Sequence, residues 1–501
     1  MDKSQQHSQA KIIAKNSVAL IVARISDFLF GFIFIKLSTN YLGKITYGDY
    51  TYLSSIVCVI IPFASFGLQR ILIREMTSHD KSMFPKYFTS ALVIKGTFSI
   101  LSFIVVLILS YKLNISSDLR IVFIIIALSE IIAIFFLLAK TVFTAFEVMK
   151  YEAYTTIALR AVGIVLIVGA IYFKFGLLGV VVALLLHHIF GVIIGMYVVI
   201  KKFGMPSFHI DFELVKYIFI QSLPMFIILL LTQAFLRVDV FIIKTYRGSA
   251  EVGLFAAPYN LVVRLQTVVI TILTPVFPLI IRLAKNDLPK LNSVYKVIYR
   301  FLFMLTLPIS IVATVYSRNI ILFFTSPEFE ASYMALQVLI WIIVISFIEA
   351  LNNFVVIAVK KQWFTSINYV FLFLFNFLLG IFLVPRYGFI GACWGTLLSY
   401  FIIYINTYTY LYFNNIRINL ITNLSKPLLS AVIMAILLYF IKDIQYMKNV
   451  NFLNKINLAE YFNITISASI FFAGYVGLLL LTKSFSPKEI QFIKGLKRSK
   501  E

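Results

Sequence analysis

The sequence predicts an all-α membrane protein that crosses the bilayer about fourteen times, and three observations support this fold class. Of the 501 residues, 61% are hydrophobic and only 13% are charged, whereas about half and about a quarter are usual in soluble domains. Apolar runs such as 121–138, 218–236 and 370–384 cover most of a bilayer with at most one charge each. These runs do not alternate polar and apolar residues as barrel strands do, so the spans should be helices.

We expect fourteen helices, and because this number is even, both chain ends should lie on the same side of the membrane. If that side is the cytoplasm, 27 of the 44 Lys and Arg residues fall inside and 11 fall outside. This bias predicts that both termini are cytoplasmic. The expected helices are 12–38, 46–69, 87–110, 120–144, 153–173, 176–200, 214–243, 251–281, 297–323, 332–358, 364–384, 387–412, 424–441 and 461–482.

The composition argues against several other classes of protein. The net charge of +23 is scattered between apolar runs and forms no patch on a soluble domain, so we expect no nucleic-acid partner. Cys58 and Cys393 both fall within expected spans, which disfavours a disulfide scaffold or a metal site. We expect no cofactor and no catalytic residue, because every loop is short and no Walker A motif is present.

A short glycine motif indicates an internal repeat. Gly43–Gly48 recurs as Gly248–Gly253, 205 residues later, and Phe175–Gly179 recurs as Tyr387–Gly391, 212 residues later. We therefore expect two six-helix lobes related by a pseudo-two-fold axis along the membrane normal, an arrangement that many transporters use. The expected domains are the N-terminal lobe 1–200, the C-terminal lobe 201–417, and 418–501 with the last two helices and a basic tail.

Ionisable residues inside the spans are the candidate functional residues, because each costs about 2.5–3.5 kcal/mol on insertion scales. Arg24 and Asp27 are three residues apart on the first helix and can pair. The basic residues can grip phosphate oxygens in a cavity, and the acids can carry an ion or form internal ion pairs. The two sets are Arg24, Arg264, Arg160, Lys95 and Arg237 for substrate binding, and Asp27, Asp239, Glu130 and Glu349 for coupling or pairing.

Three stretches carry a resemblance to a known family. Lys15–Ser17 with Tyr41–Tyr50 and Gly67–Glu75, then Val252–Tyr259, and then Tyr387–Ala392 resemble the polysaccharide biosynthesis/oligosaccharide flippase family. The resemblance implies two lobes around a cavity that opens alternately to each side of a bacterial inner membrane. It implies an undecaprenyl-pyrophosphate-linked oligosaccharide as substrate, for O-antigen, capsule or exopolysaccharide, and membrane lipids, a polymerase and glycosyltransferases as partners. By helix position, Arg24 and Arg264 match cavity arginines of the related lipid II flippases.

Three alternatives remain from the sequence. A multidrug or cation antiporter of the same superfamily usually has twelve helices and a dominant cavity acid, whereas this chain has two more helices and mainly basic candidates. A lipid II flippase shares the fold and the basic cavity. A membrane glycosyltransferase or polymerase would need a large outer loop or a soluble domain, and neither is present.

Overall fold

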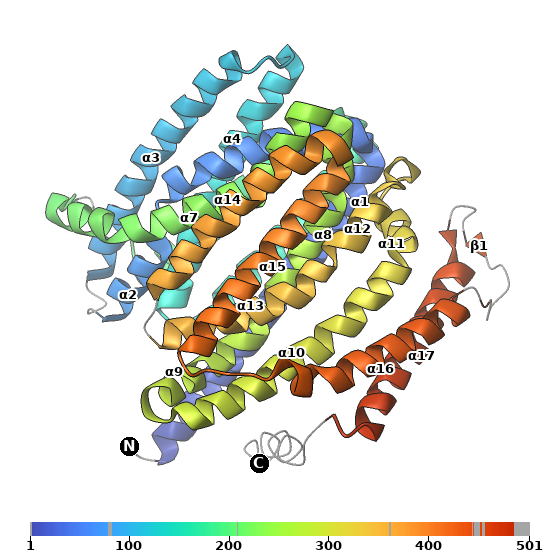
Figure 1. The fold of residues 1–501 in the computed structure, drawn as a ribbon. Helices are drawn as coiled ribbons and strands as arrows, with labels where there is room; N and C mark the ends of the chain where they lie inside the picture. The colour runs from blue at the N-terminus through green and yellow to red at the C-terminus, as the bar shows by residue number, and fades with distance from the viewer. Residues whose placement is uncertain are drawn as a thin grey trace. The chain divides into compact units, whose positions relative to one another are not determined.

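The computed structural model is almost entirely helical (Figure 1). It describes residues 3–78, 83–207, 209–359, 362–442, 444, 451–452 and 456–484. The helices are α1 (Lys3–Ser65), α2 (Leu68–Ser78), α3 (Phe84–Lys112), α4 (Ser117–Ala145), α5 (Met149–Tyr172), α6 (Gly176–Phe203), α7 (Phe212–Arg247), α8 (Ser249–Leu273), α9 (Phe277–Asn286), α10 (Leu288–Val315), α11 (Ser317–Phe324), α12 (Ser332–Leu339), α13 (Trp341–Ala358), α14 (Gln362–Tyr387), α15 (Phe389–Phe413), α16 (Leu420–Ile441) and α17 (Leu458–Leu481). Two antiparallel strands of two residues each, β1 (Asn451–Phe452) and β2 (Ile456–Asn457), precede α17.

Among the described residues, thirteen helical segments are long and apolar enough to cross a membrane. The first of them, Ile21–Ser78, covers all of the second expected helix and most of the first. Within α1 the chain breaks at Gly43, whose φ of 70° and ψ of 173° no helix can contain. Division at this glycine yields the fourteen segments expected from the sequence. The all-helical membrane fold is therefore confirmed, and the number of spans that cross a bilayer stays a prediction.

Four expected helices are interrupted, and polar or proline residues mark some of the interruptions. The expected helix 46–69 is divided between α1 and α2 at Phe66 and Gly67. The expected helix 251–281 divides at the 3-10 turn Thr274–Val276, where Pro275 cannot donate a backbone hydrogen bond. The expected helix 297–323 begins earlier, at Leu288, because Asp287 caps its first turn by accepting from the N–H of Lys290. The same expected helix ends at Val315, and α11 follows as a separate short element. The expected helix 332–358 is divided between α12 and α13.

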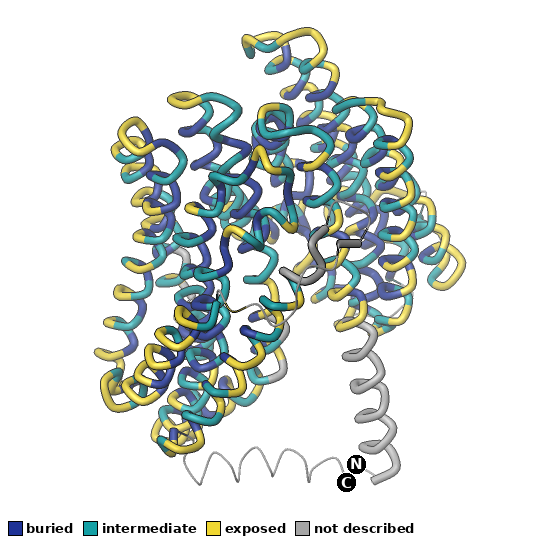
Figure 2. Tube along the Cα trace, turned by 90° about the vertical axis from the view of Figure 1, so that its right-hand side faces the viewer, coloured by how far each residue is buried: buried dark blue, intermediate teal, exposed yellow. Residues whose placement is uncertain are grey.

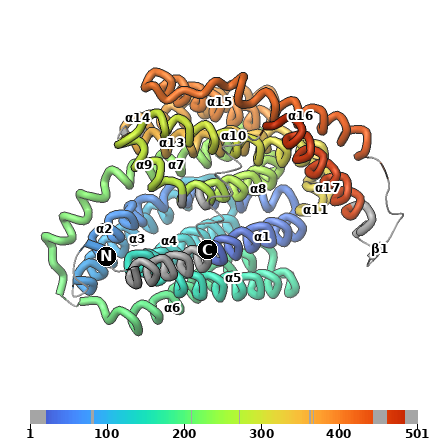
Figure 3. Tube along the Cα trace, turned by 90° about the horizontal axis from the view of Figure 1, so that it is seen from below, coloured from blue at the N-terminus to red at the C-terminus, as the bar shows by residue number. Residues whose placement is uncertain are grey.

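The chain forms two compact units. The first contains Met1–Leu261, Leu322–Ala331 and Phe373–Ala392. Inside it α1 packs against α5 and α4 packs against α6, as Figure 3 shows from below. One of its apolar cores contains Phe66, Phe88 and Phe143, all nearly inaccessible to solvent. This packing fixes the positions of polar side chains that project from α1, α4, α5 and α6.

The second unit contains Val262–Ile321, Ser332–Leu372 and Cys393–Glu501. Inside it α10 packs against α13 and α16, and α16 lies beside α17 (Figure 1). Met304, Phe471 and Tyr475 belong to the core between these helices. The last two helices thus form part of a packed unit through their contact with α10.

Many residues on the helices are exposed (Figure 2), and a large number of them are bulky and apolar. Val165, Phe440 and Leu481 have exposed fractions of 70%, 73% and 79%. A soluble protein rarely exposes extended apolar surface, whereas a membrane protein presents such faces to lipid. The exposure pattern agrees with the many apolar helices: the protein is a multi-pass membrane protein.

Candidate functional site

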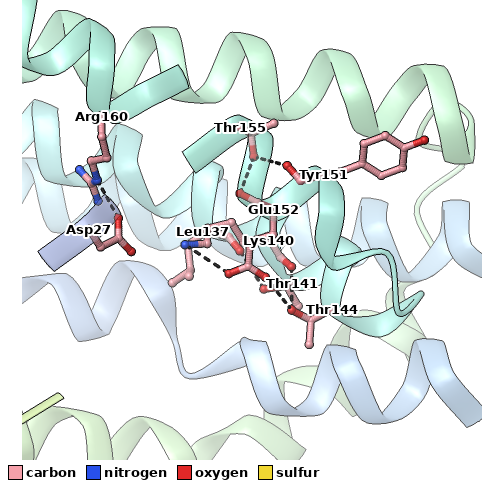
Figure 4. A network of polar contacts seen from close by, with 9 residues as sticks. All are labelled: Asp27, Leu137, Lys140, Thr141, Thr144, Tyr151, Glu152, Thr155 and Arg160. Carbon is pink, nitrogen blue, oxygen red and sulfur yellow. Dashed lines mark hydrogen bonds and ion pairs between the residues drawn. The ribbon is translucent and has the colours of Figure 1, made fainter. Parts of the chain in front are cut away.

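A buried ion pair joins α1 to α5 in the first unit (Figure 4). The Nε of Arg160 donates to Oδ1 of Asp27 over 2.7 Å, and both side chains are only about a quarter exposed, at 25% and 26%. A second guanidinium nitrogen of Arg160 lies 2.9 Å from Nε2 of His187 on α6. Because arginine only donates, this imidazole nitrogen accepts and His187 is neutral in this arrangement.

The aromatic ring of Phe30 packs against both His187 and Arg160. Phe30 stacks on His187 with ring centroids 5.2 Å apart and an angle of 4° between the planes. The guanidinium carbon of Arg160 lies 4.7 Å from the centre of the same ring. Such a cation–π contact is worth about 2 kcal/mol where water is excluded. Three helices therefore meet around one arginine, and two of its roles, pairing and stacking, are structural.

The partner of Asp27 differs from the neighbour suggested by the sequence. Arg24 is exposed, and no ion pair joins it to another described residue. Helical spacing places Arg24 and Asp27 on one face of α1, but it contains no information about which residue of another helix faces them. No acidic residue lies within about a turn of Arg160 on its own helix, so spacing along that helix indicates no partner for it. The acid comes from α1 instead, so sequence spacing within one helix could not reveal it.

Replacing Arg160 with alanine should destabilise the protein by leaving Asp27 without its counter-ion. We expect about 1–3 kcal/mol, below the usual cost for a fully buried pair because both groups retain some exposure. The double change Arg160→Ala with Asp27→Ala should recover much of the loss, while Arg24→Ala should be neutral. Membrane abundance and thermal unfolding of purified protein test this. A larger loss from Arg24→Ala than from Arg160→Ala would reverse the assignment.

The two adjacent histidines of α6 have different partners. His187 contacts Arg160, whereas Nδ1 of His188 lies 2.8 Å from the hydroxyl of Ser129 on α4. Consecutive residues of a helix point in different directions, so the two imidazoles cannot face one site. Both histidines act as polar packing between α4, α5 and α6.

Two more of the expected residues neighbour this group. Glu130 of α4 interacts electrostatically with Arg237 of α7 and with Arg160. Arg237 also interacts electrostatically with the thiol of Cys58 in the second half of α1. Arginines and carboxylates thus alternate in the first unit, and the cations at 160 and 237 are partly balanced by acids. The sequence, which lists charges without partners, predicted a more strongly cationic interior.

Lys95 of α3 stands apart from this balanced group. Its side chain is nearly inaccessible, with an exposed fraction of 3% for the residue. No hydrogen bond or ion pair joins it to any other residue that the structure describes. A buried ammonium without a counter-ion is unfavourable, so such a lysine either loses its proton or gains an anion as its partner. Of the expected substrate-binding residues, Lys95 therefore has the environment that most favours an anionic ligand.

Asp239 of α7 is buried, and Nδ2 of Asn376 on α14 donates to its Oδ2 over 2.9 Å. The sequence identified the acid but not the amide. Asn376 is a polar residue in the middle of an otherwise apolar run, and this feature could have indicated it.

In the second unit, the remaining expected residues are Glu349 and Arg264. Arg264 of α8 is half-buried. Glu349 of α13 is buried and accepts hydrogen bonds from Thr407 on α15 and from Asn352 and Asn353 on its own helix. The amides and the threonine were missed by a search restricted to charges, although two of them follow Glu349 by three and four residues, on the same helical face.

The repeated glycine motifs meet in the first unit. Gly248 has φ 82° and ψ −175°, nearly the conformation of Gly43, and each glycine breaks a helix at the corresponding place in its repeat. A Cβ atom at Gly48 would collide with the backbone carbonyl of Ser249, and one at Gly253 would collide with that of Lys44. Since Ser249 corresponds to Lys44 in the repeat, the two motifs contact each other reciprocally.

Comparisons with known proteins agree with this architecture. Residues 13–284 match the family model described as polysaccharide biosynthesis protein. No curated protein matches the sequence. The structure of a lipid II flippase MurJ in an inward closed conformation is similar with a TM-score of 0.68 at 16% identity, over 92% of this chain and 100% of that one.

Two other solved structures share the fold. An inward-facing multidrug resistance MATE family transporter of the MOP superfamily has a TM-score of 0.62 at 14% identity, over 77% of this chain and 93% of its own. A mutant of the MATE transporter VcmN from Vibrio cholerae has a TM-score of 0.58 at 15% identity, over 83% and 99%. At such identities the likeness shows the fold alone. The family model, in contrast, matches more than half of the 501 residues, and the chain therefore belongs to the polysaccharide biosynthesis protein family.

Proposed function

We propose that this protein moves undecaprenyl-pyrophosphate-linked oligosaccharide repeat units across the bacterial inner membrane by alternating access. The match of residues 13–284 to the polysaccharide biosynthesis family carries this proposal. The likeness of the fold to the lipid II flippase MurJ supports a lipid-linked substrate. The chain would act as a transporter for surface polysaccharide biosynthesis and would catalyse no covalent step.

The chemistry of the interior supports an anionic substrate. Pyrophosphate must exchange water for protein donors when it enters a low-dielectric interior, and basic side chains supply the strongest donors. Lys95 is buried with no acidic partner among the described residues. We propose that Lys95, Arg24 and Arg237 of the first unit bind the pyrophosphate, while Arg160 serves mainly to position α1 against α5. Arg264 of the second unit is proposed separately as a further pyrophosphate-binding residue.

An apolar cavity supports the lipid part of the substrate. It has a volume of about 550 Å³ in the second unit, between α10, α13 and α16. Leu307, Trp341 and Ile436 are among its lining residues, and nearly all of the lining is apolar. A hydrocarbon chain fits such a surface, because burial of each CH₂ group contributes about 0.8 kcal/mol.

We propose the same topology and domains as the sequence predicts. Both termini would be cytoplasmic, as the distribution of Lys and Arg predicts. The lobes 1–200 and 201–417 would move against each other, and helices in 418–501 would follow them. A polymerase and glycosyltransferases of the same pathway are the partners that the proposed reaction requires, since they supply and consume the repeat unit.

Deletion of the gene should abolish surface polysaccharide and cause lipid-linked repeat units to accumulate inside the cell. The physical reason is that a pyrophosphate with a chain of sugars does not cross a bilayer unaided at a useful rate. The measurement is surface polysaccharide together with the extractable lipid-linked pool, with the wild-type gene supplied in trans as the control.

The lipid II alternative has a separate outcome, which the MurJ likeness motivates. If this were the function, the chain would restore growth to cells depleted of their lipid II flippase. It would also leave surface polysaccharide unchanged on deletion. Restored growth together with unchanged polysaccharide would overturn the proposed substrate.

A further inference from the structure

Glu349 lies at the centre of a buried polar cluster in the second unit. The residue is 6% exposed. Its Oε1 accepts from the hydroxyl of Thr407 over 2.8 Å and from Nδ2 of Asn353 over 3.2 Å. Its Oε2 accepts from Nδ2 of Asn352 over 3.4 Å. Three donors from two helices thus converge on one carboxyl group.

A second layer of hydrogen bonds orients these donors. Nδ2 of Asn368 donates to the hydroxyl oxygen of Thr407 over 2.8 Å. Nδ2 of Asn406 donates to the side-chain amide oxygen Oδ1 of Asn368 over 2.5 Å. On the other side, the hydroxyl of Tyr295 donates to the side-chain amide oxygen Oδ1 of Asn352 over 2.6 Å. These bonds hold Thr407 and Asn352 in orientations from which each donates its own hydrogen to the carboxyl group. The cluster is therefore arranged to stabilise negative charge on Glu349.

Within the described part of the chain, no basic side chain forms an ion pair with that carboxyl group. No ion pair joins Glu349 to any described residue, and its interactions are hydrogen bonds to neutral groups. Arg282 and Lys285 of α9, which packs on α13, are exposed, and Arg300 of α10 forms no ion pair with Glu349. The titratable groups that face the cluster are the hydroxyls of Tyr295 and Tyr299 on α10 and of Tyr404 and Tyr408 on α15.

Tyrosine hydroxyls are neutral at physiological pH and cannot compensate a carboxylate. An isolated carboxylate inside a membrane protein costs several kcal/mol. Glu349 therefore requires a positive charge that the described part of the chain does not supply. A proton is the smallest such charge, and it fits without displacing a heavy atom.

Thr407 allows the cluster to accept that proton. Its hydroxyl oxygen lies 2.8 Å from Oε1 of Glu349 and 3.0 Å from the backbone carbonyl of Ile403. A hydroxyl has one hydrogen, so it can donate to only one of these two acceptors at a time. With Glu349 ionised, Thr407 donates to the carboxylate. With Glu349 protonated, the carboxylic acid donates to Thr407, and Thr407 donates to Ile403.

In both arrangements the hydroxyl hydrogen of Thr407 has an acceptor. In the protonated state the oxygen of Thr407 accepts from Glu349 and from Asn368, which uses both of its lone pairs. In the ionised state it accepts from Asn368 alone. Rotation of one hydroxyl hydrogen is the only change needed when the proton arrives or leaves.

We propose that Glu349 is a proton-binding site of this protein, with Thr407 as its positioning residue. One proton from water adds to the carboxylate and forms the neutral acid, and the reverse step returns it to water, with no change of oxidation state. The proton site rests on the cluster itself, and it rests on the proposed function only insofar as the bound proton would drive export.

Infrared difference spectroscopy of the purified full-length protein in lipid tests the proposal. Titration between about pH 4 and pH 10 should reveal a carboxylic acid carbonyl band that disappears as pH rises. Glu349→Gln should remove this band. Thr407→Val keeps the carboxyl group but removes a hydrogen bond to its ionised form, so the pH of half-disappearance should rise by about 0.5–1 unit.

Thr306→Val is a matched control, because Thr306 of α10 is equally buried and its hydroxyl bonds only to carbonyls of its own helix. It should leave the band and its midpoint unchanged. An infrared spectrum that Glu349→Gln does not alter would overturn the proposal, and so would a band that sodium ions, but not potassium ions, remove at constant pH. A normal proton band in a protein that fails to export polysaccharide would contradict the proposed function and leave the proton site intact.

Discussion

Replacing Gly48 or Gly253 with alanine should reduce polysaccharide export about tenfold or more. A Cβ atom at either position would collide with the backbone of the other repeat, at Ser249 or at Lys44. Overpacking costs about 1–3 kcal/mol, and about 1.4 kcal/mol changes a conformational equilibrium tenfold. The collision acts on the state in which the two motifs touch, so it should shift the balance of conformations.

The intrinsic helix propensity of alanine should stabilise these variants, so a loss of export would have to come from the collision. Both glycines lie in helices, where alanine is favoured over glycine by about 1 kcal/mol. Gly169→Ala in α5 is the matched control, because no atom lies within 4 Å of the added Cβ. It should leave export unchanged and raise stability slightly. Export and membrane abundance would be measured for all three variants.

The reciprocal contact also predicts similar effects at the two sites. Gly48→Ala and Gly253→Ala perturb corresponding positions of the repeat, and each one separates the same pair of segments. Normal export from both variants at normal abundance would show that this contact does not limit transport. A severe effect from one and none from the other would argue against equivalent roles of the two motifs.

Much of this fold could be predicted from the sequence because the bilayer imposes simple rules. Long apolar runs must be helices. The ends of the expected ranges agree to within a few residues with those of the observed α3, α4, α5, α6 and α7. The interruptions were harder to predict. Pro275 and Gly43 are visible in the sequence, yet membrane helices tolerate proline and glycine, so neither residue alone reveals a break. Only the surrounding packing determines whether a helix bends or ends there.

The candidate site was predictable in its residue types but not in its pairings. A charge in a membrane span is conspicuous, and this is how Asp27, Arg160 and Glu349 were found. Which charges touch depends on the rotation of each helix about its axis, and that rotation is decided by long-range packing. Asp27 therefore pairs with Arg160 across 133 residues of chain. Neutral partners such as Thr407 are still less visible, since threonine is common in any helix.

Replacing Lys95 with methionine should reduce export about tenfold to a hundredfold while membrane abundance stays equal or increases. The residue is 3% exposed. If its ammonium group holds the substrate pyrophosphate, the change removes a charge-assisted hydrogen bond worth about 1.5–3 kcal/mol. Methionine has nearly the same length and is apolar, so it removes the cost of an uncompensated buried charge. Function and stability should therefore change in opposite directions.

A second buried lysine provides the contrast. Lys140 of α4 pairs with Glu152 of α5 over 3.4 Å, and both side chains are largely buried (Figure 4). Lys140→Met should lower abundance, because it leaves Glu152 without its counter-ion. Lys95→Met has no such orphaned acid among the described residues. If Lys95→Met lowered abundance as Lys140→Met does, Lys95 would be a structural residue. If Lys95→Met left export normal at normal abundance, Lys95 would be excluded from the substrate path. The arginines alone would then be the candidates for binding pyrophosphate.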